Sequence, residues 1–170
     1  MATEENNDLA LSWRVMATEE NDEENDGLAL SWRVMVTEEN KALARRAWEA
    51  IDNPDLIDEV YASDVVWHEP DRDIYGTQEA KQFVSLYKRA FPDMNITVED
   101  QIAEGDKVVT RVTLRGTHQG ETEEFGPPTG RQIEGYLITI SRIEGGQIVE
   151  DWDAYDNLTT LQQLGLAPEQ

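Results

Sequence analysis

The C-terminal half of the sequence contains four long strand-like segments, each bounded by turn residues. They cover residues 95–103, 107–118, 132–143 and 147–155. Gly105 lies in the turn between the first two segments, and Gly145 and Gly146 form the turn between the last two. Strands that are joined by such short turns pair antiparallel. This half of the chain is therefore expected to form an antiparallel sheet.

Helical patterns and one further strand precede these segments. The spacing of apolar residues predicts helices over residues 37–51, 56–61 and 76–91. Thr37 is expected to cap the first of them, residues 65–69 read as a strand, and a short helix follows Asn157. This order predicts an α+β fold, in which a curved antiparallel sheet wraps around three N-terminal helices. Such a sheet forms a cone whose mouth has room for a small ligand.

The N-terminal part of the chain holds an imperfect duplication. Residues 9–16 and 28–35 are identical in sequence, and each copy belongs to an acidic, polar segment. Both copies show a strand-like alternation of Leu, Trp and Val, but two short copies are too few for a repeat architecture. We therefore divide the chain into an acidic extension, residues 1–34, and a domain, residues 35–170. Whether the apolar copies pair with each other or cover a neighbouring surface stays open.

The sequence is strongly acidic, with 36 Asp and Glu, 14 Lys and Arg, and a net charge of −22. A field of this sign repels nucleic acid and anionic membranes, so neither is expected as a partner. The acidic residues are spread along the whole chain. This spread favours a surface adapted to high salt, as in halophilic proteins, over a binder of cations or basic partners.

The residues that are absent narrow the class of protein. The sequence has no cysteine, which excludes disulfide bonds, thiolate zinc ligands and a cysteine nucleophile. No apolar run reaches the roughly 18 residues of a membrane span. The N-terminus lacks the basic and apolar regions of a signal peptide, so a cytoplasmic protein is expected.

The last strand-like segment is unusual because three aspartates lie in and just after it. Alternation places Asp151 and Asp153 on one face together with Tyr155. Burying a carboxylate costs about several kcal/mol unless another group pairs with it. The strand therefore either lies at a solvated edge or lines a polar pocket. Asp156 and Asn157 compete to cap the helix that follows.

Several motifs, in order along residues 36–167, are typical of one protein family. They are Val66-Trp67-His68-Glu69-Pro70, Ala90-Phe91-Pro92-Asp93, Ala103-Glu104-Gly105-Asp106, Arg115-Gly116-Thr117-His118-Gln119-Gly120 and Ile148-Val149-Glu150-Asp151-Trp152-Asp153. With the order of the elements, they resemble the SnoaL-like polyketide cyclases, or ester cyclases, of the nuclear transport factor 2-like superfamily. The resemblance implies a cofactor-free enzyme that closes a ring in a small hydrophobic or polyketide-like substrate by intramolecular aldol condensation. It also implies a homodimer formed through the exposed face of the sheet.

The same resemblance implies a catalytic site. Asp153 aligns with the aspartate that removes a carbon-bound proton in the cyclases, and an apolar pocket would raise its pKa to suit that role. His68 matches a histidine common in the family, and it is expected to polarise a carbonyl or to orient the base. The residues expected to contact the substrate are Trp67, Phe83, Tyr87, Arg111, His118, Tyr136, Thr139 and Trp152. Thr139 stands where many cyclases carry a histidine that faces the aspartate. No spacing resembles a metal-ligand set, so no metal is expected.

Other interpretations remain open for the same residues. Asp153 also fits a solvent-facing acid, His68 a half-buried structural histidine, and Arg111 a surface ion pair. Epoxide hydrolysis on this fold would use two carboxylates and an arginine around one water, and here those would be Asp153, Asp151 and Arg111. An isomerase, or a non-catalytic domain that binds a small ligand or dimerises, is a further alternative.

Overall fold

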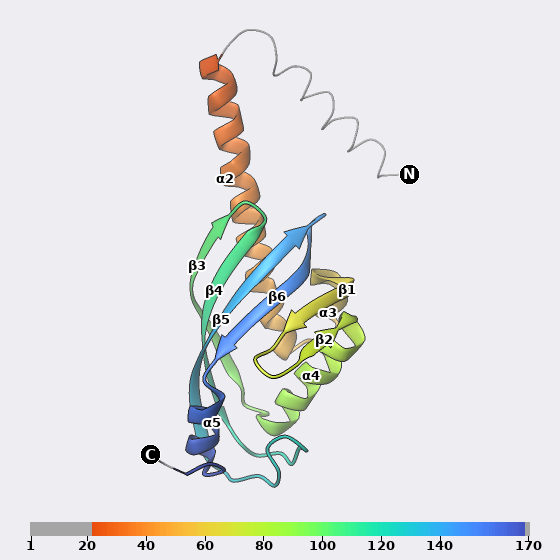
Figure 1. Cartoon of the computed structure of the whole chain (residues 1–170), viewed down its shortest axis with the longest axis vertical. Helices are drawn as coiled ribbons and strands as arrows, with labels where there is room; N and C mark the ends of the chain where they lie inside the picture. Colours follow the sequence, from red (N-terminus) through yellow and green to blue (C-terminus); the bar gives the residue numbers. More distant parts are fainter. Residues whose placement is uncertain (1–21, 169–170) are drawn as a thin grey trace. The chain divides into compact units, whose positions relative to one another are not determined.

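The computed structural model describes residues 22–168, and the chain divides into two units, residues 1–36 and 37–170 (Figure 1). In the first unit, the described residues belong to α2, which spans Asp22–Ala47. The second copy of the duplicated segment, residues 28–35, is therefore helical, and the strand prediction is wrong for this copy. The first copy lies outside the described residues.

The predicted helix start at Thr37 is also wrong, because α2 continues through this residue without a break. Residues 28–47 contain neither glycine nor proline. A helix that has already formed adds such residues at little cost, whereas starting a new helix is costly. The capping side chain at Thr37 therefore does not decide where the helix begins.

A six-stranded sheet runs through the second unit in the order β2-β1-β6-β5-β4-β3. The strands are β1 (Tyr61–His68), β2 (Asp73–Tyr75), β3 (Asn95–Glu104), β4 (Lys107–Thr117), β5 (Gln132–Glu144) and β6 (Gln147–Tyr155). The sheet is curved and unclosed, with β2 and β3 at its edges (Figure 1). Neighbouring strands are antiparallel except β1 and β6, which run parallel. The predicted α+β fold with a curved sheet is confirmed. The strand β2 was not predicted, because three residues are too few to show an alternating pattern in the sequence.

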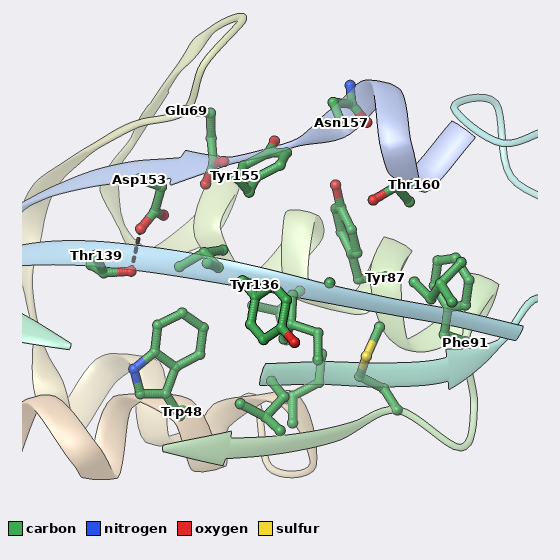
Figure 2. Close-up of a pocket in the computed structure, with 18 of the residues that line it drawn as sticks. Trp48, Glu69, Tyr87, Phe91, Tyr136, Thr139, Asp153, Tyr155, Asn157 and Thr160 are labelled. Atoms are coloured by element: carbon green, nitrogen blue, oxygen red, sulfur yellow. Dashed lines mark hydrogen bonds between the residues drawn. The ribbon is translucent and has the colours of Figure 1, made fainter. Parts of the chain in front are cut away.

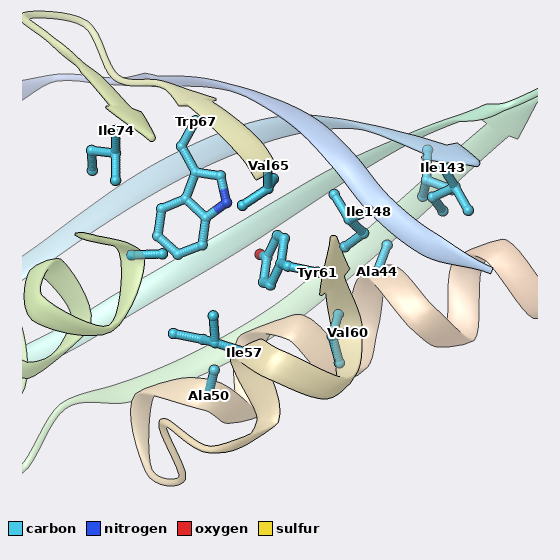
Figure 3. Packing of buried hydrophobic residues seen from close by; sticks show 12 residues of the cluster. Ala44, Ala50, Ile57, Val60, Tyr61, Val65, Trp67, Ile74, Ile143 and Ile148 are labelled. Atoms are coloured by element: carbon cyan, nitrogen blue, oxygen red, sulfur yellow. The ribbon is translucent and has the colours of Figure 1, made fainter. Parts of the chain in front are cut away.

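Short helices and α4 complete the second unit. They are the 3-10 helix η1 (Trp48–Ile51), α3 (Leu56–Val60), α4 (Gly76–Ala90) and α5 (Asn157–Leu164). One buried cluster joins η1, α3 and α4 to the sheet, and Figure 3 shows Ala50 of η1, Ile57 of α3 and Ile148 of β6 within it. Leu164 of α5 belongs to a second buried cluster. Removing such apolar surface from water is the main contribution to the stability of this packing. Among residues 22–168, no helix combines the length and the apolar character that a membrane crossing needs.

The junction of β6 and α5 is fixed by a side-chain cap. Asp156 Oδ1 accepts a hydrogen bond from the backbone N–H of Thr159 at 3.0 Å. The Thr159 hydroxyl and N–H together lower the pKa of Asp156. Of the two competing caps, Asp156 takes this role and Asn157 is the first helical residue. Asp156 is thus a structural acid, in contrast to the other two aspartates of the segment.

Candidate active site

A pocket of about 500 Å³ lies in the second unit, against the sheet face that carries Asp151 and Asp153 (Figure 2). Its walls are mainly aromatic and aliphatic. The aromatic residues among them include Trp48, Trp67, Phe83, Tyr87, Phe91 and Phe125. Glu69 and Asp153 lie at one end, whereas Asn157 and Thr160 of α5 lie at the other (Figure 2). No lysine, arginine or histidine is found among the described residues that line the pocket.

Asp153 occupies the acidic end of the pocket and receives a hydrogen bond across the sheet. It lies on β6 directly opposite Thr139 of β5, and the Thr139 hydroxyl donates to Asp153 Oδ1 (Figure 2). Glu69 also forms a side-chain hydrogen bond with Asp153. Burial raises the pKa of Asp153, while these two hydrogen bonds act in the opposite direction. Both hydrogen bonds therefore favour the ionised form of Asp153.

Two further carboxyl groups share this end of the pocket. Glu69 follows β1 and is 8% exposed, and Asp151 of β6 is 3% exposed. Burial first, and the charge of Asp153 second, raise the pKa of both Glu69 and Asp151 to about 8. Asp151 Oδ1 is buried and has no hydrogen-bond partner within residues 22–168, which also disfavours its charged form. Near neutral pH Glu69 and Asp151 are thus neutral carboxylic acids, and the charge that opposes their ionisation is that of Asp153.

Buried hydroxyl groups complete the polar end of the site. Burial raises the pKa of Tyr61, Tyr87 and Tyr155, so their hydroxyls stay neutral. The hydroxyls of Ser141 and Tyr61 interact with Asp151, and Tyr155 interacts with Glu69. In the described part of the chain, no group of three acidic or histidine side chains is arranged to hold a metal ion. The arrangement is suited to moving protons in a largely apolar surrounding.

The structure brings six of the predicted site residues to the pocket. Trp67, Phe83, Tyr87, Thr139 and Asp153 line it directly. Tyr136 borders it as well, but its side chain is 61% exposed and alternation with the inward-facing Leu137 places it on the outer face of the sheet. Thr139, which stands where many cyclases carry a histidine, thus contacts Asp153 through its hydroxyl.

His68 and Trp152 lie on the opposite face of the sheet. The register of β1 and β6 pairs Trp67 with Asp151 and His68 with Trp152, so successive residues face opposite sides. His68 contacts Asp73 Oδ1 at 2.8 Å and Glu150 Oε1 at 3.1 Å, and its ring stacks on Trp152 at 5.5 Å. These two carboxylates raise the pKa of His68. The geometry does not bring His68 to Asp153, in contrast to the assisting role expected from the sequence.

Arg111 and His118 also lie away from the pocket. Arg111 is on the exposed face, where its guanidinium donates two hydrogen bonds of 3.1 Å to Asp100. His118 is fully buried, and its Nδ1 accepts from the backbone N–H of Thr129 at 3.3 Å. Its ring packs against Phe91 and Phe125, which do line the pocket. His118 therefore supports the wall from behind and does not reach a ligand.

Glu69 is the pocket residue that the sequence interpretation missed. It stands two residues after Trp67, so strand alternation continued past His68 places both side chains on the same face. Pro70 ends the strand pattern in the sequence, so alternation within the predicted strand does not by itself assign position 69 to the pocket. Alternation in the sequence predicts that Asp151 shares a face with Asp153, and both line the pocket.

Comparison with known proteins places this site in a family. The sequence profile of the SnoaL-like polyketide cyclases matches residues 41–164. IdmH of Streptomyces antibioticus, a proposed polyketide cyclase, is 32% identical with a TM-score of 0.64, over 74% of this chain and 98% of that one. AclR of Streptomyces galilaeus, a proposed hydroxylase, is 30% identical with a TM-score of 0.67, over 78% and 89% of the two chains.

A more distant structure shows the fold alone. A Catenulispora acidiphila protein with a ketosteroid isomerase-like fold is 18% identical with a TM-score of 0.62, over 74% of this chain and 93% of that one. No curated protein matches the sequence. The profile match covers most of the chain and includes Glu69 and the strands that carry Thr139 and Asp153. The chain belongs to the SnoaL-like polyketide cyclase family.

Proposed function

We propose that the protein is a cofactor-free cyclase in which Asp153 is the general base. The observation that carries this proposal is the position of Asp153, which lines an aromatic pocket and accepts a hydrogen bond from Thr139. Burial raises the pKa of Asp153. A raised pKa makes a carboxylate a stronger base near neutral pH, provided that it stays ionised.

The proposed reaction is an intramolecular aldol condensation. The Asp153 carboxylate takes a proton from a carbon activated by a neighbouring carbonyl group, and the electrons of the C–H bond form an enolate. The enolate carbon then attacks a second carbonyl carbon of the same molecule, which closes a ring and leaves an alkoxide that takes up a proton. The Thr139 hydroxyl holds the base in place during these steps.

The proposed substrate is a small, largely apolar molecule of the polyketide type, without a negative charge. The aromatic walls offer broad apolar contact, and no cationic side chain of the described lining residues is present to pair with an anion. Asn157 and Thr160 supply neutral hydrogen-bonding groups for the far end of such a molecule.

Epoxide hydrolysis receives less support from the site. That chemistry was expected to place an arginine beside two carboxylates, but Arg111 is bound to Asp100 on the exposed face of the sheet. The two carboxylates are present in the pocket as Asp151 and Asp153. The missing arginine favours proton abstraction from carbon over attack by an activated water.

Incubation with two classes of substrate tests the proposal. Methyl esters of linear or partly cyclised polyketides should be converted to ring-closed products, and aliphatic epoxides should remain intact. Asp153→Asn should lose the ring closure while still binding the ester, which ligand-induced tryptophan fluorescence would measure. Hydrolysis of the epoxide, or binding of the ester without conversion by the unaltered protein, would contradict the cyclase assignment.

A homodimer formed through the outer sheet face is part of the proposal. Tyr136, Ile138 and Ile140 of β5 present exposed apolar side chains on this face. Ion pairs surround them, and these are Arg111–Asp100, Arg115–Glu134 and Arg142–Glu150. The pairs offset part of the negative charge of this face in a chain of net charge −22, which lowers the repulsion between two copies that meet here. The cytoplasmic location and the adaptation to high salt stay predictions from the sequence.

A further inference from the structure

Glu69 is held at the pocket next to Asp153 by the turn that follows β1. The Glu69 backbone N–H donates to the Arg72 carbonyl oxygen at 2.9 Å, which closes the turn between β1 and β2. Its carboxyl group lines the same pocket as Asp153, and Figure 2 shows both carboxyl groups at the same end, with Tyr155 beside Glu69. The mechanism proposed above uses only Asp153 as an acidic residue, so it assigns no role to the buried Glu69.

Two carboxyl groups in hydrogen-bond contact hold a proton between them. Glu69 and Asp153 make such a contact, and two adjacent buried carboxylates repel each other too strongly for both to be ionised. Thr139 donates to Asp153, which favours the charge on Asp153 and the proton on Glu69. The titratable and charged groups that face the pair are Tyr61 of β1, Arg72 of the β1–β2 turn, Tyr87 of α4, and Asp151 and Tyr155 of β6.

We propose that Glu69 is the catalytic acid of this site and that it shares one proton with the base Asp153. The proposal rests on the proposed cyclase function and extends it to the second half of the reaction. No histidine or lysine among the described pocket residues offers a proton to the product oxygen. Glu69 supplies that proton. The reaction therefore needs no histidine at position 139, where this chain has Thr139.

The shared proton lets the pair complete and reset the reaction by itself. Asp153 takes the proton of the breaking C–H bond and becomes a carboxylic acid, while the electron pair forms the enolate. When the new C–C bond forms, the alkoxide takes the proton of the Glu69 carboxylic acid, and Glu69 becomes a carboxylate. The proton on Asp153 then moves to Glu69 along their hydrogen bond. Both groups return to their starting states with no net gain or loss of protons.

A titration without any substrate tests the shared proton directly. Carbon-13 NMR of the Glu69 side-chain carboxyl should give a midpoint near pH 8 in the unaltered protein. In Asp153→Asn the midpoint should fall, because the neighbouring charge is removed, but it should stay above the ordinary value of about 4.3 because Glu69 remains buried. A Glu69 midpoint that does not respond to Asp153→Asn would overturn the proposal.

Turnover of a methyl-ester polyketide separates an acid from a merely structural residue. Glu69→Gln keeps a hydrogen bond to Asp153 but has no proton to give, so kcat should fall by about 10²–10⁴-fold with KM changed only a few-fold. In the unaltered protein kcat/KM should fall as the pH rises through about 8, because the shared proton is lost. This decline should vanish in Glu69→Gln and persist in Asp151→Asn, which removes the other acid that titrates there.

The controls keep the two proposals apart. Glu144→Gln changes an exposed glutamate at the end of β5, which is paired with Arg142 away from the pocket, and it should leave turnover unchanged. Circular dichroism should show the same fold for all variants. Full turnover in Glu69→Gln, with none in Asp153→Asn, would overturn the role of Glu69 and leave Asp153 as the base. Full turnover in Asp153→Asn would overturn the cyclase mechanism, and the role of Glu69 with it.

Discussion

The two faces of β6 carry carboxyl groups that are adjacent in the sequence but differ in burial, in partners and in the direction of their pKa shifts. On the outer face, Glu150 accepts from Arg142 Nε at 3.0 Å and contacts His68 Nε2 at 3.1 Å. These partners lower the pKa of Glu150, with His68 as the largest contribution. On the inner face, burial raises the pKa of the neighbouring Asp151 to about 8.

The comparison shows what separates a structural acid from a reactive one in this protein. All three carboxylates of β6, at positions 150, 151 and 153, belong to one strand in one sheet. The outer one is solvated and paired with cations, so its ionised form is stable and inert. The inner ones are desolvated and have hydroxyl or carboxyl partners only, so proton transfer becomes accessible near neutral pH.

The largest expected effect is the loss of turnover when the inner-face residue Asp153 is changed. Asp153→Asn removes the base but keeps the size of the side chain, so turnover of a methyl-ester polyketide should fall by about 10²–10⁴-fold. The outer-face change Glu150→Gln should alter kcat by no more than a few-fold. Steady-state kinetics of the two purified variants checks this. Equal losses in both would show that the faces do not divide the chemistry.

The next effect concerns the assembly proposed for the outer face. Ile138→Glu places an unpaired acid in the apolar patch of β5, and burying it against a second copy should weaken the dimer by about 2 kcal/mol or more. Leu158→Glu in α5 is the matched control, because Leu158 is a similarly exposed apolar side chain outside the sheet and its change should leave the dimer intact. Sedimentation equilibrium measures both. A monomeric unaltered protein would refute the proposed dimer.

Much of the second unit could be predicted from the sequence because its elements carry periodic signals. The strands β3 to β6 alternate over nine or more residues, and the turns between paired strands contain glycine. The motifs around Trp67 and Asp153 gave the family, and the profile match confirms it. The start of α2 was missed because Thr37 is a good cap in isolation, while the helix in the structure already extends through it.

The site was harder to predict, because the face on which a side chain lies depends on register between strands far apart in sequence. His68 and Trp67 are equally close to the family motif, and only the pairing of β1 with β6 sends one outward and the other inward. Arg111 fits an anion-binding role in the sequence because its cross-strand partner is not apparent there. In the structure Asp100 lies opposite it and accepts its hydrogen bonds. Glu69 was overlooked because nothing local marks it as a partner of Asp153, which is 84 positions away.

A smaller effect sharpens the comparison through the pH dependence of stability. The folded protein holds a proton on Asp151 up to about pH 8, whereas the unfolded chain releases it near pH 4. Because the folded state binds more protons in this interval, Asp151 makes stability fall as the pH rises. Asp151→Asn removes this penalty and should stabilise the protein at about pH 9 relative to pH 5, by on the order of 1–3 kcal/mol. Urea unfolding at both pH values measures it, with Asp100→Asn as the exposed, ion-paired control.

The smallest expected effect has the opposite sign and belongs to the outer face. Glu150 first, and Asp73 second, raise the pKa of His68, so the protonated ring stabilises the folded state. This contribution is complete below the ordinary histidine pKa of about 6.5 and is lost as the pH rises through the raised value. His68→Gln should therefore lower the free energy of unfolding at about pH 6, by no more than about 1 kcal/mol because the site is partly solvated, and have no such effect at about pH 9. Turnover should stay unchanged at both pH values. A loss of turnover in His68→Gln without a loss of stability would assign catalysis to the outer face, and the division between the two faces of β6 would not hold.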